Sequence, residues 1–150
     1  MHKTDSYEEV LEVAIDREID ANQFYLALAS RVDDKEMREV FEDLAQEELE
    51  HKAKLELELM KMGKTVEIKQ PPETPQRTYI ISDNQSLLDM DYGSMLKLAM
   101  EKEEAAFRLY VDLVQNVHDT ESREMLLGLA QEEVRHKLRF QIEYDMITEL

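Results

Sequence analysis

The amino-acid sequence predicts an all-α protein, a four-helix bundle made of two similar helical hairpins that one long crossover joins. Three observations lead to this prediction. Glycine and proline occur only three times each in 150 residues, and 35% of the residues are charged, which is typical of helical proteins. Apolar residues recur at alternating steps of three and four, the spacing of one helix face. A segment of the first half, LAQEELEHK, returns in the second half as LAQEEVRHK.

The repeat extends over both hairpins. With an offset of 85 residues, which takes Leu44 to Leu129, about 20 of 52 aligned positions are identical without a gap. Chance similarity between two unrelated helices would give far fewer identities. We therefore expect hairpin 91–150 to repeat the structure of hairpin 6–63. A chain of this length can bury one hydrophobic core, so we expect residues 1–150 to form a single domain.

Composition excludes several classes of function. The formal net charge of -17 argues against binding to nucleic acid, which needs a basic surface. The chain has no cysteine, so it has no iron-sulfur cluster, and any metal must be bound by oxygen and imidazole ligands. The first ten residues do not resemble a signal peptide, and there is no run of 18 apolar residues. We expect a cytoplasmic protein without a membrane partner.

The first hairpin should contain two antiparallel helices. The first is expected over 6–31, with Ser6 as N-cap, and the second from Asp33 or Asp34 to residue 62, with Gly63 at its C-terminal end. The turn between them is short, so the two helices should be neighbours. The buried face, or seam, of the first helix consists of Leu11, Ala14, Glu18, Ala21, Tyr25, Leu28 and Val32. The seam of the second consists of Phe41, Leu44, Glu48, His51 and Leu55.

Residues 64–90 differ from the helices and are expected to form the crossover linker. They contain all three prolines and a short β-prone run at 79–81. Fully extended, these residues could span roughly 90 Å, whereas a 26-residue helix is roughly 40 Å long. The linker can therefore travel the whole bundle, so that the third helix begins at the end where the second helix begins.

The second hairpin should copy the first. The third helix is expected over 91–117 and the fourth from the turn at 118–120 almost to residue 150. The seam of the third helix consists of Leu96, Ala99, Glu103, Ala106, Tyr110, Leu113 and Val117. The seam of the fourth consists of Leu126, Leu129, Glu133, His136 and Phe140.

Ionisable residues interrupt all four seams. An unpaired carboxylate in a dry core costs several kcal/mol at least, and four together would repel one another. Two divalent cations would cancel four such charges. One Glu from each of two helices, with a Glu-x-x-His from each of the other two, is the ligand set of the di-iron and di-manganese carboxylate bundles. The expected metal ligands are Glu18, Glu48, His51, Glu103, Glu133 and His136.

On these motifs the chain resembles the ferritin-like di-iron superfamily, which includes the rubrerythrins and bacterioferritins. The resemblance covers both hairpins and implies a ferritin-like bundle. It implies that Glu18 and Glu103 are terminal carboxylates, that Glu48 and Glu133 bridge the metals, and that His51 and His136 are imidazole ligands. It also implies that Tyr25 and Tyr110 donate to ligand carboxylates, although core packing alone would explain both tyrosines.

The cofactor implied by the resemblance is a pair of iron ions, with manganese or zinc as the other metals that suit these ligands. Rubrerythrins proper have a further Glu three residues after the third-helix ligand, where this chain has Ala106, and a rubredoxin domain, which needs cysteine. Bacterioferritins bind haem through a Met that follows the second-helix Glu. Here that position is Leu49, so haem is not expected.

Three functions are compatible with this site. Resemblance to rubrerythrins implies an oxidoreductase that reduces peroxide with an external electron donor, and we favour this hypothesis. Resemblance to bacterioferritins implies a ferroxidase or an iron-binding protein. A di-iron monooxygenase would need an apolar cavity beside the metals. Four small seam residues could leave space for one or could simply allow close helix packing: Ala14, Ala21, Ala99 and Ala106. The small oxidant would be H2O2 or O2, and we expect a homodimer or another small homo-oligomer.

Two other interpretations concern the polar residues. The six seam residues could form a buried hydrogen-bond network without metal, but nothing would then compensate four carboxylates. Glu47 and Glu132 also repeat, one residue before the expected ligands Glu48 and Glu133. Because they fall off the seam, we expect them to be surface charge and not metal ligands.

Overall fold

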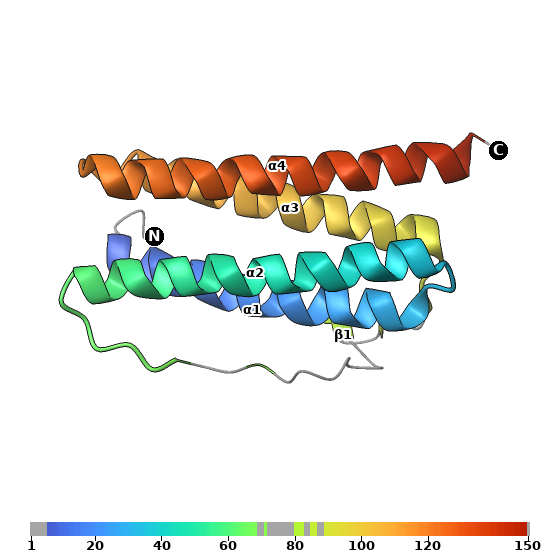
Figure 1. The fold of residues 1–150 in the computed structure, drawn as a ribbon, viewed down its shortest axis with the longest axis horizontal. Coiled ribbons are helices and arrows are strands. Elements are labelled where there is room, and N and C mark those ends of the chain that lie inside the picture. The colour runs from blue at the N-terminus through green and yellow to red at the C-terminus, as the bar shows by residue number, and fades with distance from the viewer. Residues whose placement is uncertain (1–5, 69–70, 72–79, 83–84, 87–88, 150) are drawn as a thin grey trace.

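Four long helices lie side by side in the computed structural model, which describes residues 6–68, 71, 80–82, 85–86 and 89–149 (Figure 1). They are α1 (Tyr7–Arg31), α2 (Lys35–Lys61), α3 (Tyr92–Val114) and α4 (Thr120–Thr148). The predicted all-α four-helix bundle is confirmed. None of the helices in the described ranges is long and apolar enough to span a membrane.

The helices begin where polar side chains satisfy free backbone N–H groups. The Ser6 hydroxyl accepts a hydrogen bond from the Glu9 N–H at 3.1 Å, and the Glu9 carboxylate accepts one from the Ser6 N–H at 3.0 Å, which makes a capping box. Asp91 and Asp119 cap α3 and α4 in a similar way. Asp34 occupies the same position before α2, but its side chain makes no capping bond.

The end of α3 differs from the prediction, whereas α1 ends at Arg31 as predicted. At the end of α3, the N–H groups of Gln115 and Asn116 bond to carbonyls three residues back, a tighter turn that ends the α-helix at Val114. Val117 therefore lies beyond α3, and Val32 is the C-cap residue of α1 and not part of it. Gly63 adopts a φ of 84° just after α2, a conformation that favours glycine, as predicted.

The two hairpins are α1 with α2 and α3 with α4, and residues 62–91 connect them. Met90 and Tyr92, at the start of α3, pack in the same cluster as Val32 and Val40, which flank the turn between α1 and α2. The third helix thus begins where the second begins, as the crossover prediction required (Figure 1). Within the connection, β1 (Ile80–Ser82) pairs with β2 (Gln85–Ser86) in an antiparallel manner. Much of the predicted linker lies outside the described residues.

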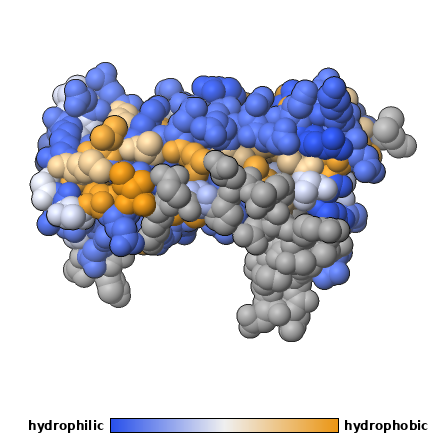
Figure 2. Space-filling model, turned by 60° about the horizontal axis from the view of Figure 1, so that its bottom comes forward, coloured by the Kyte–Doolittle hydropathy of each residue, from blue (hydrophilic) through white to orange (hydrophobic). Residues whose placement is uncertain are grey.

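The hydrophobic core consists of two clusters with a polar layer between them. One cluster includes Phe24, Phe41 and Phe140, and the other includes Leu11 and Leu55. Along each helix, the ionisable seam residues fall between the members of the two clusters. Outside, hydrophilic residues cover much of the face toward the connection, with a band of hydrophobic residues across it (Figure 2). The polar layer is therefore sealed by apolar packing at both ends.

Candidate metal centre

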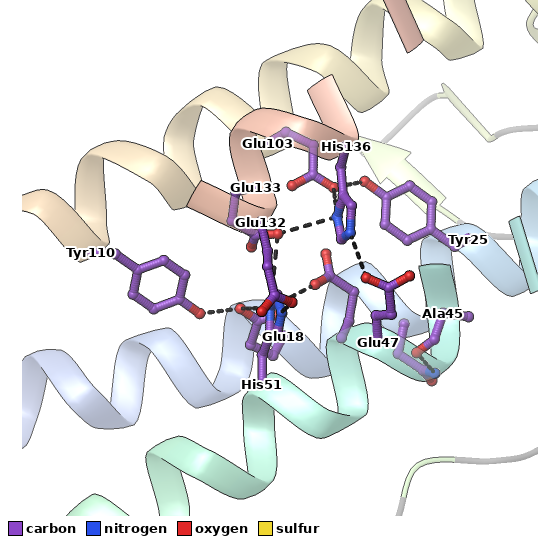
Figure 3. Close-up of polar contacts among 12 residues, drawn as sticks. Glu18, Tyr25, Ala45, Glu47, His51, Glu103, Tyr110, Glu132, Glu133 and His136 are labelled. Carbon is purple, nitrogen blue, oxygen red and sulfur yellow. Dashed lines mark hydrogen bonds and ion pairs between the residues drawn. The ribbon is translucent and has the colours of Figure 1, made fainter. Parts of the chain in front are cut away.

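The structure brings all six predicted site residues together in the polar layer. Glu18 comes from α1, Glu48 and His51 from α2, Glu103 from α3, and Glu133 and His136 from α4 (Figure 3). None of the six is more than 3% exposed. Each Glu-x-x-His pair lies on one face of its helix, because three residues rotate a helix by nearly one turn. The residues are thus fixed by four rigid helices and not by loops.

The histidines direct the same ring nitrogen, Nδ1, toward the carboxylates. His51 Nδ1 lies 3.0 Å from a Glu48 oxygen and 3.6 Å from a Glu18 oxygen. His136 Nδ1 lies 3.3 Å from a Glu103 oxygen and 3.3 Å from a Glu133 oxygen. The two imidazole rings are nearly parallel, with centroids 6.1 Å apart. Both Nδ1 atoms are therefore placed to bind cations held among the carboxylates.

The ligand atoms divide into two groups of four that share two members. The atoms of each group lie within 4.8 Å of one another. The first group comprises Glu18, Glu48, His51 and Glu133; the second comprises Glu48, Glu103, Glu133 and His136. Two neighbouring cations could thus share Glu48 and Glu133, while each has one further carboxylate and one imidazole. This is the division of roles that the resemblance implied.

Several carboxylate oxygens have no partner in the protein. Among the described residues, Glu18 Oε1, Glu103 Oε1 and Glu133 Oε2 are buried and accept no hydrogen bond. Buried polar atoms are almost always satisfied, so three such atoms in one cluster need an explanation. A hydrogen-bond network without metal does not satisfy them. Divalent cations would, and oxygen-rich sites with imidazole suit iron, manganese and zinc.

The electrostatics of the cluster lead to the same interpretation. Burial raises the pKa of Glu48 well above its usual range, and the negative charges of Glu18 and Glu103 raise it further. Burial and the neighbouring glutamates raise the pKa of Glu133 in the same way. Burial alone would lower the pKa of His51, but hydrogen bonds to Glu18 and Glu48 raise it to about 11. The raised pKa values of Glu48, Glu133 and His51 favour bound protons in the metal-free cluster, and cations would compete with these protons for the same atoms.

Two tyrosines close the cluster from opposite sides. The Tyr25 hydroxyl donates a short hydrogen bond to Glu103 Oε2, and the Tyr110 hydroxyl donates one to Glu18 Oε2 (Figure 3). Burial and the adjacent carboxylates raise the pKa of both tyrosines, so both remain protonated donors. Each tyrosine belongs to one hairpin and its acceptor to the other. Core packing alone therefore does not account for Tyr25 and Tyr110, because each also donates a hydrogen bond to a carboxylate of the cluster.

Glu47 and Glu132 are in contact with the histidines, which the sequence did not predict. His136 Nε2 lies 3.0 Å from a Glu47 oxygen, and His51 Nε2 lies 2.7 Å from a Glu132 oxygen (Figure 3). The expectation that both are merely surface charge is wrong, although both side chains are partly exposed, by 37% and 28%. A carboxylate on the outer nitrogen orients an imidazole for metal binding through the inner one. Their repetition at four residues before each His was the available signal.

Asn22 fixes the site from the side of α1. Its buried amide donates a hydrogen bond of 2.8 Å to the carbonyl of Ala45, one turn before the expected ligand Glu48 on α2. The equivalent residue of the second hairpin is Phe107, so this contact has no counterpart there. The residue was not predicted, because an off-seam amide is usually a surface group.

Comparisons with known proteins agree with the fold. A search of curated proteins finds no significant match. The solved structure of a hypothetical protein from Pyrococcus furiosus is similar, with a TM-score of 0.79 and 29% sequence identity over 96% of this chain and 91% of that one. The bundle is thus of the ferritin-like type. The family model described as Rubrerythrin matches residues 9–144. The buried Glu and His cluster is compatible with a di-iron site, and the chain belongs to the rubrerythrin family.

Proposed function

We propose that this protein is a di-iron oxidoreductase that reduces peroxide at the cluster of four glutamates and two histidines. The observation that supports this proposal is the set of buried carboxylate oxygens without partners, together with two imidazole Nδ1 atoms that face them. The charge of two divalent cations matches that of four carboxylates. Membership of the rubrerythrin family is consistent with iron as the metal.

Each residue of the cluster has a role in this proposal. Glu48 and Glu133 belong to both groups of ligand atoms and would bridge the ions. Glu18 and His51 would complete the ligands of one ion, and Glu103 and His136 would complete those of the other. This assignment of ligands to ions is a prediction. When bound, two Fe(II) ions would supply the two electrons that reduce H2O2 to water. An external electron donor must then restore the ferrous state.

The hydrogen bonds around the ligands serve to keep the cluster in place. Tyr25 and Tyr110 each occupy one oxygen of a terminal carboxylate and leave the other oxygen for a cation. A carboxylate held in this way cannot swing freely, which reduces the cost of ordering it when the ion binds. Glu47 and Glu132 hold the outer imidazole nitrogens of the two histidines in a similar way.

The expectation of a cytoplasmic protein that forms a small homo-oligomer stays a prediction.

Rapid mixing tests the proposal. Protein loaded anaerobically with Fe(II) is mixed with H2O2 or with O2, and the ferric absorbance is followed. Peroxide should oxidise the ferrous protein faster than O2 does at equal concentration, with one H2O2 consumed per two Fe(II). Faster oxidation by O2 would favour a ferroxidase instead. Metal analysis of protein purified from its own host decides between iron, manganese and zinc.

A further inference from the structure

A pocket opens from the outside of the bundle to the cluster, between α1 and α3. Its volume is about 250 Å³, and its inner wall includes Glu18, Glu48, Glu103 and Glu133. The unpartnered oxygens of Glu18, Glu103 and Glu133 belong to side chains of this wall. A small molecule that enters the pocket would thus reach the oxygens expected to bind metal.

Two alanines leave the space for this pocket. Ala21 and Ala106 occupy equivalent positions of the repeat, each three residues after a seam glutamate, and both line the pocket. Both are partly exposed, whereas their seam neighbours Ala14 and Ala99 are fully buried. The seam is therefore open beside the cluster, where a larger side chain at position 21 or 106 would narrow the opening.

An ion pair limits the width of the opening. Lys102 on α3 reaches Asp20 on α1, with 2.9 Å between Nζ and a carboxylate oxygen, and both residues line the pocket. Lys102 Nζ also lies 5.1 Å from the centre of the Phe24 ring, which steadies the side chain. The Lys102–Asp20 ion pair thus links α3 to α1 and makes part of the pocket wall charged. Ala21 and Ala106 make another part of the wall apolar.

We propose that this pocket is the substrate entrance and that it admits peroxides with a small alkyl group as well as H2O2, with Ala21 and Ala106 setting the size limit. This inference rests on the proposed peroxide reduction. At roughly 30 Å³ per non-hydrogen atom, the share of a water molecule in the liquid, H2O2 needs roughly 60 Å³ and tert-butyl hydroperoxide roughly 180 Å³. Cumene hydroperoxide carries a rigid phenyl ring in place of one methyl group, so it needs a wider passage between Ala21 and Ala106.

The chemistry is the same for both substrates. The O–O bond of ROOH breaks, two electrons and two protons are taken up, and one alcohol ROH and one water are formed. The electrons are those of the two ferrous ions in the proposed function, which the external donor replaces. The alkyl group takes no part in the reaction, so the space beside the alanines determines whether such a substrate fits.

The test compares three chains and three peroxides. The chains are the wild type, the double variant Ala21→Leu with Ala106→Leu, and the control Ala53→Leu, which makes the same change at an exposed position of α2 outside the pocket. Each is checked for helicity, thermal unfolding and metal content. Each is then loaded with Fe(II) and mixed rapidly with H2O2, tert-butyl hydroperoxide or cumene hydroperoxide.

We expect H2O2 and tert-butyl hydroperoxide to oxidise the wild type, and cumene hydroperoxide to oxidise it much more slowly. The double variant should lose rate with tert-butyl hydroperoxide by roughly 10- to 200-fold, the range that one or two misfitting carbon groups produce in a pocket. Ala53→Leu should behave as the wild type. A single Ala106→Val change should give an intermediate loss and serves if the double variant does not fold.

A second measurement does not depend on turnover. Protein loaded with redox-inert Zn²⁺ is titrated with tert-butanol, and shifts of the backbone amide signals of residues 21 and 106 are expected in the wild type but not in the double variant. A wild type that reacts with H2O2 but rejects tert-butyl hydroperoxide would overturn this inference and leave the proposed function intact. A double variant with an unchanged rate would also overturn it. Reaction with neither peroxide would refute the proposed function. The NMR shifts with tert-butanol would then still show whether a small alkyl compound enters the pocket, and their absence in the wild type would overturn the proposed entrance.

Discussion

Removal of Glu47 should weaken metal binding, although this residue is not an expected ligand. If His136 binds a cation through Nδ1, its Nε2 carries the proton and donates it to Glu47 over 3.0 Å. A hydrogen bond to a charged group contributes about 1.5–3 kcal/mol. The Glu47 side chain is 37% exposed, so we take the lower half of that range, about 1.5–2 kcal/mol. Glu47→Ala should therefore lower metal affinity by about 10- to 30-fold.

Competition between the protein and a chromophoric chelator for Zn²⁺ or Co²⁺ measures this change. Glu50→Ala is the matched control, because Glu50 is exposed on the same helix and its removal deletes the same charge. Glu47→Gln should recover much of the affinity, since its amide oxygen can still accept from the imidazole. Equal affinities of Glu47→Ala and Glu50→Ala would refute the positioning role. Complete loss of one metal would instead identify Glu47 as a ligand.

Three further predictions concern metal content, pH and capping. Glu48→Ala should abolish binding of the metal pair, measured as metal per chain, because both groups of ligand atoms contain Glu48; retention of two metals would contradict the assignment. The metal-free protein should be more stable at pH 5 than at pH 8. Folding raises the pKa of Glu48, Glu133 and His51, so the folded chain retains protons that the unfolded chain loses above their ordinary values of 4.5 and 6.5. Stability is then lost as the pH rises toward the folded values, for His51 about 11, at about 1.4 kcal/mol per pH unit for each such proton. Chemical denaturation with EDTA at both pH values tests the sign. Ser6→Ala should cost about 1 kcal/mol and lower Tm by about 2–4 °C, while a Tm unchanged in calorimetry would show that the capping box is unimportant.

The helices could be predicted because one pattern determines both their period and their buried face. The steps of three and four that pass through Leu11, Glu18 and Tyr25 also specify which residues meet inside the bundle. The end of α3 was less predictable. The seam pattern includes Val117, but the chain leaves the helix at Val114 through a tighter turn, and periodicity gives no information about such a local hydrogen-bond choice.

The six cluster residues followed from the seam, whereas Glu47 and Glu132 did not. Periodicity distinguishes buried from exposed faces, and both residues lie at the margin between them. Whether a marginal carboxylate reaches a histidine depends on the distance between α2 and α4, which is a tertiary property. The recurrence of Glu47 and Glu132 four residues before each histidine was the available signal, but exposed pairs such as Glu39 and Glu124 recur at the same offset, so the repeat alone did not distinguish them.

The contacts of the site cross from one hairpin to the other. Tyr25 of the first hairpin holds Glu103 of the second, and Tyr110 of the second holds Glu18 of the first. The pairs of His51 with Glu132 and of His136 with Glu47 cross in the same way. A half-length chain with one hairpin would hold only one partner of each contact. Such a chain could complete the centre only by associating with a second copy of itself.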